Sequence, residues 1–167
     1  MIMTKTHHKQ RIGWGAAALL LLLACGLFAQ QPPPTTDVAV IVNPLNPVES
    51  ISSADLHKIF AGEKQSWGGN QPVFVFVRAP QARERAVLLE RVMHMTESEY
   101  RQYWVKKLYS GEVQHEPLAL MSNGMQLEAV RAEKGGIALI SMQDVHPGVK
   151  VLKIDGHLPG TPGYLLK

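Results

Sequence analysis

The stretch 52–78, SSADLHKIFAGEKQSWGGNQPVFVFVR, predicts a helix, a turn and a buried strand in immediate succession. One of the two serines at its start can cap the helix, because a hydroxyl oxygen accepts hydrogen bonds from the free N–H groups of a first turn. Apolar side chains then recur at i, i+3 and i+4 and share one face; they are Leu56, Ile59 and Phe60. Gly62 supplies the left-handed residue that commonly ends a helix. The β-branched and aromatic run 73–77 is typical of a buried strand, and Arg78 stands at its end.

The first 29 residues have the pattern of an export signal, with a basic segment followed by an apolar run. The run 13–28 is shorter than the about 20 residues of a membrane-spanning helix, which favours a cleaved signal over a retained anchor. Two processing sites are consistent with it. Residues 22–25 (LLAC) resemble a bacterial lipobox, which would make Cys25 the lipidated first residue. Residues 27–29 (LFA) suit an ordinary signal peptidase less well, because Leu27 is large, so the lipoprotein is slightly preferred.

Charge and cysteine content exclude several classes of function. Three of the 17 basic residues lie in the N-terminal segment, which contains no acid, and the other 14 balance the 14 acidic residues of the chain. A near-neutral domain without a basic stripe is not expected to bind nucleic acid. Cys25 is the only cysteine, so we expect no disulfide, thiolate metal cluster or cysteine nucleophile in the domain that follows.

Alternating strands and helices predict an α/β fold. A proline-rich linker, 30–36, precedes an ordered domain, 37–167. Strands are predicted at 38–42, 73–77, 118–121, 137–140 and 149–154, the last of them an edge or half-exposed strand. Helices are predicted to start near residues 53, 82, 97 and 125. This order favours a mixed or largely parallel sheet flanked by helices.

Two helices follow Arg78. The first, from Gln81 or Ala82, is predicted to turn an apolar stripe inward and its charged residues outward; these are Arg83, Glu84, Arg85 and Arg91, against Ala86, Leu89 and Met93. The second begins at a capping box formed by Thr96 and Glu99. Its aromatic stripe is predicted to be core, because aromatic side chains dominate buried area; it contains Tyr100, Tyr103 and Trp104.

Anion binding is the chemistry that the residue pattern favours. The chain has no G-x-S-x-G elbow, no Walker loop and no paired histidines on a helix, so we expect neither an enzyme nor a metal or cofactor site. Oxyanions bind to N–H groups at helix N-termini together with arginines and hydroxyls. The candidate ligand-binding residues, which lie at two such helix starts, are Arg78, Gln81, Ala82, Arg83, Ser122 and Asn123. The alternative is that the arginines form an ordinary solvated face.

The order of motifs resembles the substrate-binding components of phosphate ABC importers, which are type II periplasmic binding proteins. The matching segments, spread over nearly all of 37–164, are 56–62 with Trp67 and Gly69, 73–78, 103–104, 109–111, Val130 with 135–140, and 151–156 with Pro159 and Tyr164. The resemblance implies a single lobe of that fold, in a periplasmic or envelope protein that binds phosphate or another small oxyanion for uptake or sensing. It also implies an ABC permease or another envelope protein as partner, with the membrane reached only through the signal or a lipid anchor. Residue matching carries over Arg78 as a ligand contact.

Two departures from the family pattern support a second interpretation. The family usually has a Ser-Gly-Thr anion loop shortly after the arginine strand, whereas residues 79–85 here read APQARER. The match also lies on the later part of a two-lobed protein, and a clamshell holds its ligand between two lobes. The alternative function is therefore an envelope protein-interaction module that retains the fold and has lost its ligand.

Overall fold

The computed structural model describes residues 36–167, so the predictions for the signal, for Cys25 and for most of the linker lie outside the described residues. The helices of the described part are α1 (Ser53–Phe60), η1 (Gly68–Asn70), α2 (Arg83–Val87), η2 (Leu88–Met93), α3 (Glu97–Tyr109), α4 (Asn123–Ala132) and η3 (Met142–Asp144). The strands are β1 (Val38–Val42), β2 (Ser50–Ile51), β3 (Phe74–Arg78), β4 (Leu118–Leu120), β5 (Gly136–Ser141), β6 (Lys150–Val151) and β7 (Lys153–Ile154). Over residues 36–167, no helix is both long enough and apolar enough to span a bilayer.

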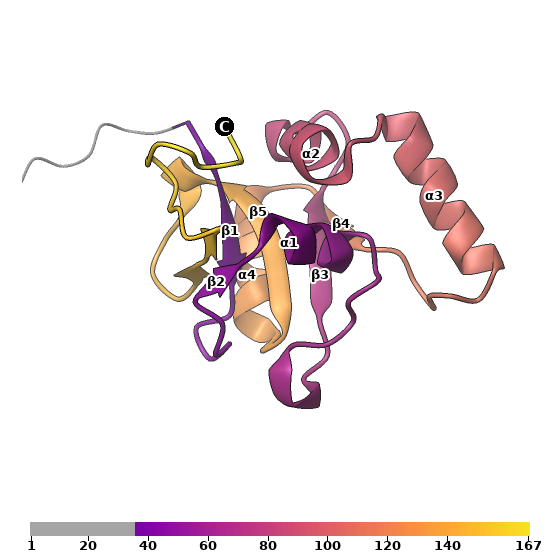
Figure 1. The fold of residues 1–167 in the computed structure, drawn as a ribbon, viewed down its shortest axis with the longest axis horizontal. Coiled ribbons are helices and arrows are strands. Elements are labelled where there is room, and N and C mark those ends of the chain that lie inside the picture. Colours follow the sequence, from indigo (N-terminus) through magenta and orange to yellow (C-terminus); the bar gives the residue numbers. More distant parts are fainter. Residues whose placement is uncertain (1–35) are drawn as a thin grey trace, which may run out of the picture. The chain divides into compact units, whose positions relative to one another are not determined.

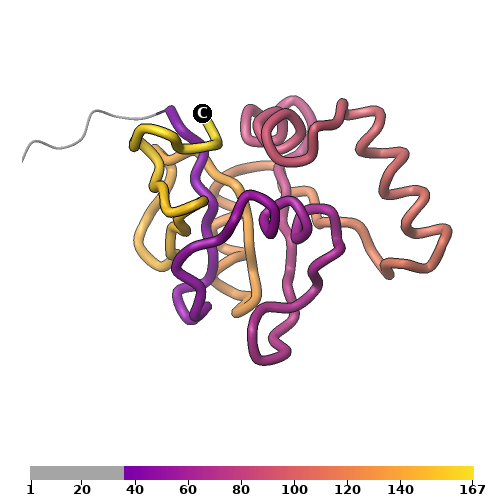
Figure 2. Tube along the Cα trace, viewed as in Figure 1, coloured from indigo at the N-terminus to yellow at the C-terminus, as the bar shows by residue number. Residues whose placement is uncertain are grey.

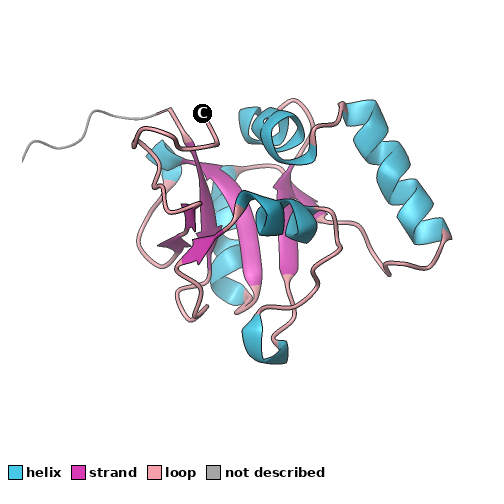
Figure 3. Ribbon diagram, viewed as in Figure 1, coloured by secondary structure: helices cyan, strands magenta, loops and turns pink. Residues whose placement is uncertain are grey.

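Five strands form a mixed sheet in the order β4-β3-β5-β1-β6, and Figure 1 labels the first four of them. β3 is parallel to both β4 and β5, whereas β1 is antiparallel to β5 and β6. The prediction of a mixed sheet flanked by helices is therefore confirmed, with α1 in front of the sheet and α4 behind it in Figure 3. β2 and β7 form a separate parallel pair.

The two faces of the sheet bury two separate hydrophobic clusters. Successive side chains of β1 alternate between them, because the side chains of a strand point to opposite faces. Val38, Val40 and Val42 join the cluster that includes α1, η2 and the aromatic residues of α3. Ala39 and Ile41 join the smaller cluster under α4. All five residues of β1 are fully buried, which explains why the run 38–42 is apolar throughout.

The chain returns to β1 at its end. In the tube of Figure 2 the last residues run beside the start of β1, where the Val38 N–H donates to the Leu166 carbonyl over 2.9 Å. The predicted strand at 149–154 is divided here: β6 pairs with β1, and β7 pairs with β2. Leu152 lies between them and is fully buried, so the prediction of one continuous strand is wrong, whereas β6 is an edge strand with both residues half-buried, as predicted. The alternation of apolar and polar residues in 149–154 therefore reflects two short strands that pair with different neighbours.

Helix starts were predicted well. Ser52 caps α1 by accepting from the Asp55 N–H over 3.0 Å, and Thr96 and Glu99 form the reciprocal capping box of α3. Gly62 has the expected left-handed backbone, with φ of 69° just after α1. These features depend on neighbours within a few residues, which is why a sequence pattern reveals them.

The helix after Arg78 differs from its prediction. α2 continues directly as the π-helical turn η2, and within it Glu84 and Arg85 are buried whereas Ala86 is exposed. Arg85 is buried because it donates to both carboxylate oxygens of Glu97, at 3.0 and 2.9 Å, and lies over the ring of Tyr100. Charged side chains tolerate burial when they are paired. The predicted charged outer surface is therefore wrong for these two residues.

Candidate functional site

Three parallel strands end at one edge of the sheet, where α2 and α4 begin. Ligands of open α/β sheets bind beyond the carboxyl ends of the strands, where helix N-termini point toward them. Arg78 is the last residue of β3, and its side chain is 15% exposed. Its Nη1 donates to the Leu120 carbonyl at the end of β4 over 3.1 Å. Arg78 is thus held at the edge by the neighbouring strand.

A carboxylate of the chain itself lies against this arginine. Glu84, in the first turn of α2, places its Oε2 3.6 Å from the Arg78 Nε, with the Glu84 side chain only 7% exposed. Its other oxygen, Oε1, accepts a hydrogen bond of 2.7 Å from the Asn123 Nδ2 in the first turn of α4. Arg78 and Asn123, both predicted as ligand-binding residues, therefore converge on one buried carboxylate.

A second carboxylate extends the network. The Asn123 Nδ2 also donates to Asp144 Oδ2 over 2.7 Å, from η3 just after β5. The network therefore contains one arginine and two carboxylates, so it carries an excess of negative charge. That excess opposes an additional free anion, because like charges destabilise each other in a partly buried site.

Three buried polar atoms at this edge have no hydrogen-bond partner among residues 36–167. They are the Arg78 Nε, the Asn123 Oδ1 and the Gln126 Oε1. Gln126 is fully buried one turn along α4, and its Nε2 donates to the Phe76 carbonyl of β3 over 3.4 Å. Buried polar groups are normally satisfied, so this edge has unused hydrogen-bonding capacity of both kinds, one donor and two acceptors.

Among the described residues, the other predicted site residues form no side-chain hydrogen bond or ion pair with the network of Arg78, Glu84 and Asn123. Ser122 caps α4 by accepting from the Met125 N–H over 3.1 Å. Ala82 is the N-cap of α2, and its N–H donates to the Ala79 carbonyl over 3.4 Å. Gln81 is exposed with φ of 72°, and the exposed Arg83 donates to the Thr36 carbonyl at the start of β1. Neither Gln81 nor Arg83 belongs to the network around Arg78.

Sequence reasoning missed Glu84, Asp144 and Gln126. For Glu84 a signal existed, since an acid in the first turn of a helix that directly follows an arginine strand lies near that arginine. For Asp144 and Gln126 the sequence carries no comparable signal, because their neighbours come from other elements. In the described part of the chain, no group of three histidine, cysteine, aspartate or glutamate side chains is arranged to hold a metal ion.

Comparison with known proteins gives a family and a fold. The sequence profile described as PBP superfamily domain matches residues 28–160. Among curated proteins, none matches the chain. An ABC-type phosphate transport receptor from Vibrio cholerae is similar in structure, with a TM-score of 0.59 and 19% identity over 74% of this chain and 48% of the receptor.

Two further solved structures are similar over the same 74% of the chain. One, from Clostridium perfringens, is assigned as a phosphate ABC transporter substrate-binding protein and holds bound phosphate; its TM-score is 0.61 at 20% identity over 46% of its length. The other is PstS from Borrelia burgdorferi, with a TM-score of 0.59 at 18% identity over 49% of its length. The chain therefore spans about half the length of these proteins, and the likeness is one of fold.

Proposed function

The chain belongs to the PBP superfamily, and from this membership we propose that it is a non-enzymatic solute-binding protein of the cell envelope whose ligand is a small oxyanion such as phosphate. The similar structures support the ligand class, since they are named as phosphate receptors or substrate-binding proteins. The predicted export signal and Cys25 support the location. Mass spectrometry of the mature N-terminus tests which of the two processing sites is used.

The observation that carries this proposal is the carboxylate of Glu84. Arg78 and Asn123 already direct donors at one anionic group, at the edge where α4 begins. Carboxylates and phosphates accept hydrogen bonds from the same kinds of donor, and arginine suits both. We propose that the ligand binds to Arg78 beside the Glu84 carboxylate, and that the N–H groups of the first turn of α4 also donate to it.

Glu84 then competes with the ligand. At an effective dielectric of about 20, two like charges about 5 Å apart repel by roughly 3 kcal/mol. Binding of an oxyanion is therefore strongly weakened while Glu84 stays charged and in place. Replacing Glu84 by glutamine removes this repulsion and keeps an acceptor for Asn123. The Glu84→Gln variant is therefore expected to bind phosphate at least about tenfold more tightly than the unchanged protein.

Titration calorimetry of the purified chain with phosphate and with sulfate tests the proposal. The matched variant is Arg78→Gln with Glu84→Gln, which removes the arginine without leaving a buried unpaired charge, and it should bind neither anion. Arg83→Gln is the control, because Arg83 lies outside the network and contacts the Thr36 carbonyl. Absence of heat from Glu84→Gln at millimolar phosphate would overturn oxyanion binding at Arg78.

A second candidate function is an envelope protein-interaction module that retains the fold without the ligand. The same salt bridge favours it, because Arg78 is already neutralised and the edge carries excess negative charge. The partner would be an ABC permease or another envelope protein. Cross-linking in envelope fractions separates the two functions: a stable partner recovered equally by the unchanged protein and by Glu84→Gln, without phosphate binding in either, would favour the module.

A further inference from the structure

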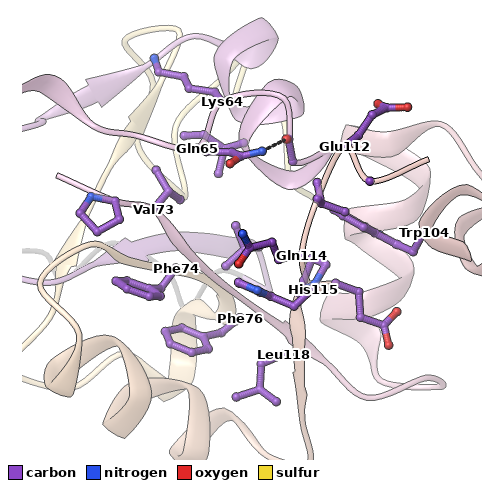
Figure 4. A pocket seen from close by; sticks show the side chains of 18 residues that line it. Lys64, Gln65, Val73, Phe74, Phe76, Trp104, Glu112, Gln114, His115 and Leu118 are labelled. Atoms are coloured by element: carbon purple, nitrogen blue, oxygen red, sulfur yellow. Dashed lines mark hydrogen bonds between the residues drawn. The ribbon is translucent and has the colours of Figure 1, made fainter. Parts of the chain in front are cut away.

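A cavity of about 600 Å³ lies along the first half of β3, away from Arg78 at the other end of the strand. Figure 4 shows its lining residues, which come from the loop after α1, the start of β3, Trp104 of α3 and the segment between α3 and β4. Apolar side chains dominate the wall, and Phe74 and Leu118 remain 38% and 57% exposed. Volume and lining are typical of sites that hold a small ligand.

The backbone of β3 has a free edge inside this cavity. Along a strand, successive residues turn their N–H and C=O groups to opposite sides. Phe74 donates its N–H toward β5, to the Gly135 carbonyl over 3.0 Å, and Ala79 donates toward β4, to the Leu120 carbonyl over 2.9 Å. Val73 and Val75 share the side of Ala79, so their backbone groups face the β4 side.

β4 does not reach this part of the edge. Its pairing with β3 begins at Phe76 and Leu118, and the preceding residue, Pro117, has no N–H to donate. Beyond the other end of the gap, the Val73 N–H donates to the Gln65 carbonyl over 2.9 Å. In between lie the Val73 carbonyl and the Val75 N–H, and neither is hydrogen-bonded to a residue in the range 36–167.

This pair of groups matches one residue of an extended peptide. In a parallel ladder, a single residue donates its N–H to one carbonyl and accepts from the N–H two positions further along the opposing strand. Between the Val73 N–H, which donates to Gln65, and the start of the pairing with Leu118, the free groups match one residue only, so we do not expect a long strand of another protein to add here. A short free peptide can enter, with an apolar side chain against Phe74 and Leu118.

The rim of the cavity selects for positive charge. Lys64 is paired with Asp55 at 3.0 Å, and Glu112 is paired with Lys107 at 3.5 Å. Glu116 is exposed and has no ion pair within the described part of the chain. An exposed carboxylate beside the apolar wall attracts a cationic group on the ligand, and the attraction is weakened by salt.

We propose that this cavity binds a short cationic peptide, one residue of which adds to β3 through the Val73 carbonyl and the Val75 N–H while its apolar side chain packs on Phe74 and Leu118. The site is separate from Arg78, and it does not depend on the oxyanion function. Trp104 lines the cavity and reports on its occupancy by fluorescence.

Titration of the purified chain with a library of tripeptide amides built from lysine, leucine, valine and phenylalanine tests the proposal. We expect lysine-containing members to bind and to change the fluorescence of Trp104. N-methylation of the residue that pairs with β3 should weaken binding about tenfold, because it removes the donor to Val73. Replacing lysine by glutamate in the peptide should weaken binding as well.

Two variants separate the cavity from the rest of the surface. Leu118→Lys places a positive charge on the cavity wall at a half-exposed position and should abolish binding of the cationic peptide, whereas Met121→Lys, 73% exposed and outside the cavity, should leave it unchanged. The double variant at Arg78 and Glu84 should bind peptide normally, which distinguishes this site from the oxyanion site. Absence of binding by the whole library at millimolar concentration, or equal binding by Leu118→Lys, would overturn the proposal.

Discussion

The two ends of β3 differ in how completely their polar groups are paired. At its carboxyl end, Arg78 is held by a neighbouring strand and faces a carboxylate supplied by the chain, so the charge of the arginine has a partner within the domain. At its amino end, the ladder stops one residue short and apolar side chains remain open to solvent. A buried charge left alone costs several kcal/mol, whereas one exposed amide pair costs little while water reaches it. Unpaired backbone groups at the amino end of β3 therefore destabilise the fold much less than an unpaired charge at its carboxyl end would.

Breaking the charge pair should have the largest effect on stability. Arg78→Gln leaves Glu84 buried without its cation, and we expect the free energy of unfolding to fall by roughly 3 kcal/mol. Urea denaturation followed by circular dichroism measures it. Adding Glu84→Gln should restore much of the loss, since the double variant has no unpaired buried charge. A loss equal to that of the exposed control Arg83→Gln would show that the pair contributes nothing.

A substitution at Gly62 tests how tightly Trp104, on the wall of the cavity, is packed. Its φ is 69°, and a Cβ there would lie 2.8 Å from the Cη2 atom of Trp104. Gly62→Ala combines backbone strain with a collision against that ring, so we expect a loss of about 2 kcal/mol in thermal or urea unfolding. Gly69→Ala is the matched control, because Gly69 has φ of 70° with open space around it. The control should lose about 1 kcal/mol; equal losses would show that Trp104 moves freely.

The N-terminal cap of α4, Ser122, should contribute to stability near the carboxyl end of β3. Ser122→Ala removes the acceptor of the Met125 N–H, and we expect a loss of about 1 kcal/mol in the same unfolding assay. Ser98→Ala, at an exposed position inside α3, should change stability by less than about 0.5 kcal/mol. If the two variants are equally stable, the cap is satisfied by water instead.

Replacing Tyr100 by phenylalanine should have the smallest effect on the free energy of unfolding at neutral pH, and the titration of the Tyr100 phenol should be visible only in alkali. Burial raises the pKa of its phenol to about 12, although the charge of Arg85 beside it acts to lower the pKa. The folded protein then holds this proton between pH 10 and 12 while the unfolded chain loses it, so the free energy of unfolding falls as the pH rises through that range. Spectrophotometric titration near 295 nm should show one late-titrating phenol fewer in Tyr100→Phe. At pH 7 that variant should be about as stable as the unchanged protein, since the hydroxyl has no hydrogen-bond partner within residues 36–167.

Local signals predicted much of this fold. Thr96 was predicted correctly as the cap of α3 and Gly62 as the left-handed residue, and of the two serines predicted as possible caps of α1, Ser52 is the cap. Each depends on atoms within four residues along the chain, so its cause is written in the sequence. The continuous apolar run 38–42 likewise has one stable place, because only a central strand buries both of its faces.

Charged positions on α2 were not predictable in this way. Helical periodicity predicted that Glu84 and Arg85 face solvent, but both are buried by partners from other elements, Arg78 and Glu97. A charge is accommodated inside a domain only by a specific partner, and periodicity carries no information about that partner.

The sequence by itself determined the caps of α1 and α3, the central position of the strand 38–42 and the place of Arg78 at a strand end, because each is a matter of local geometry and burial. Tertiary structure alone decided that Glu84 meets Arg78 and Asn123, and that β4 begins one residue too late to cover β3. The physical reason is register: contacts between residues far apart in sequence depend on how strands align, and a shift of one residue changes every partner.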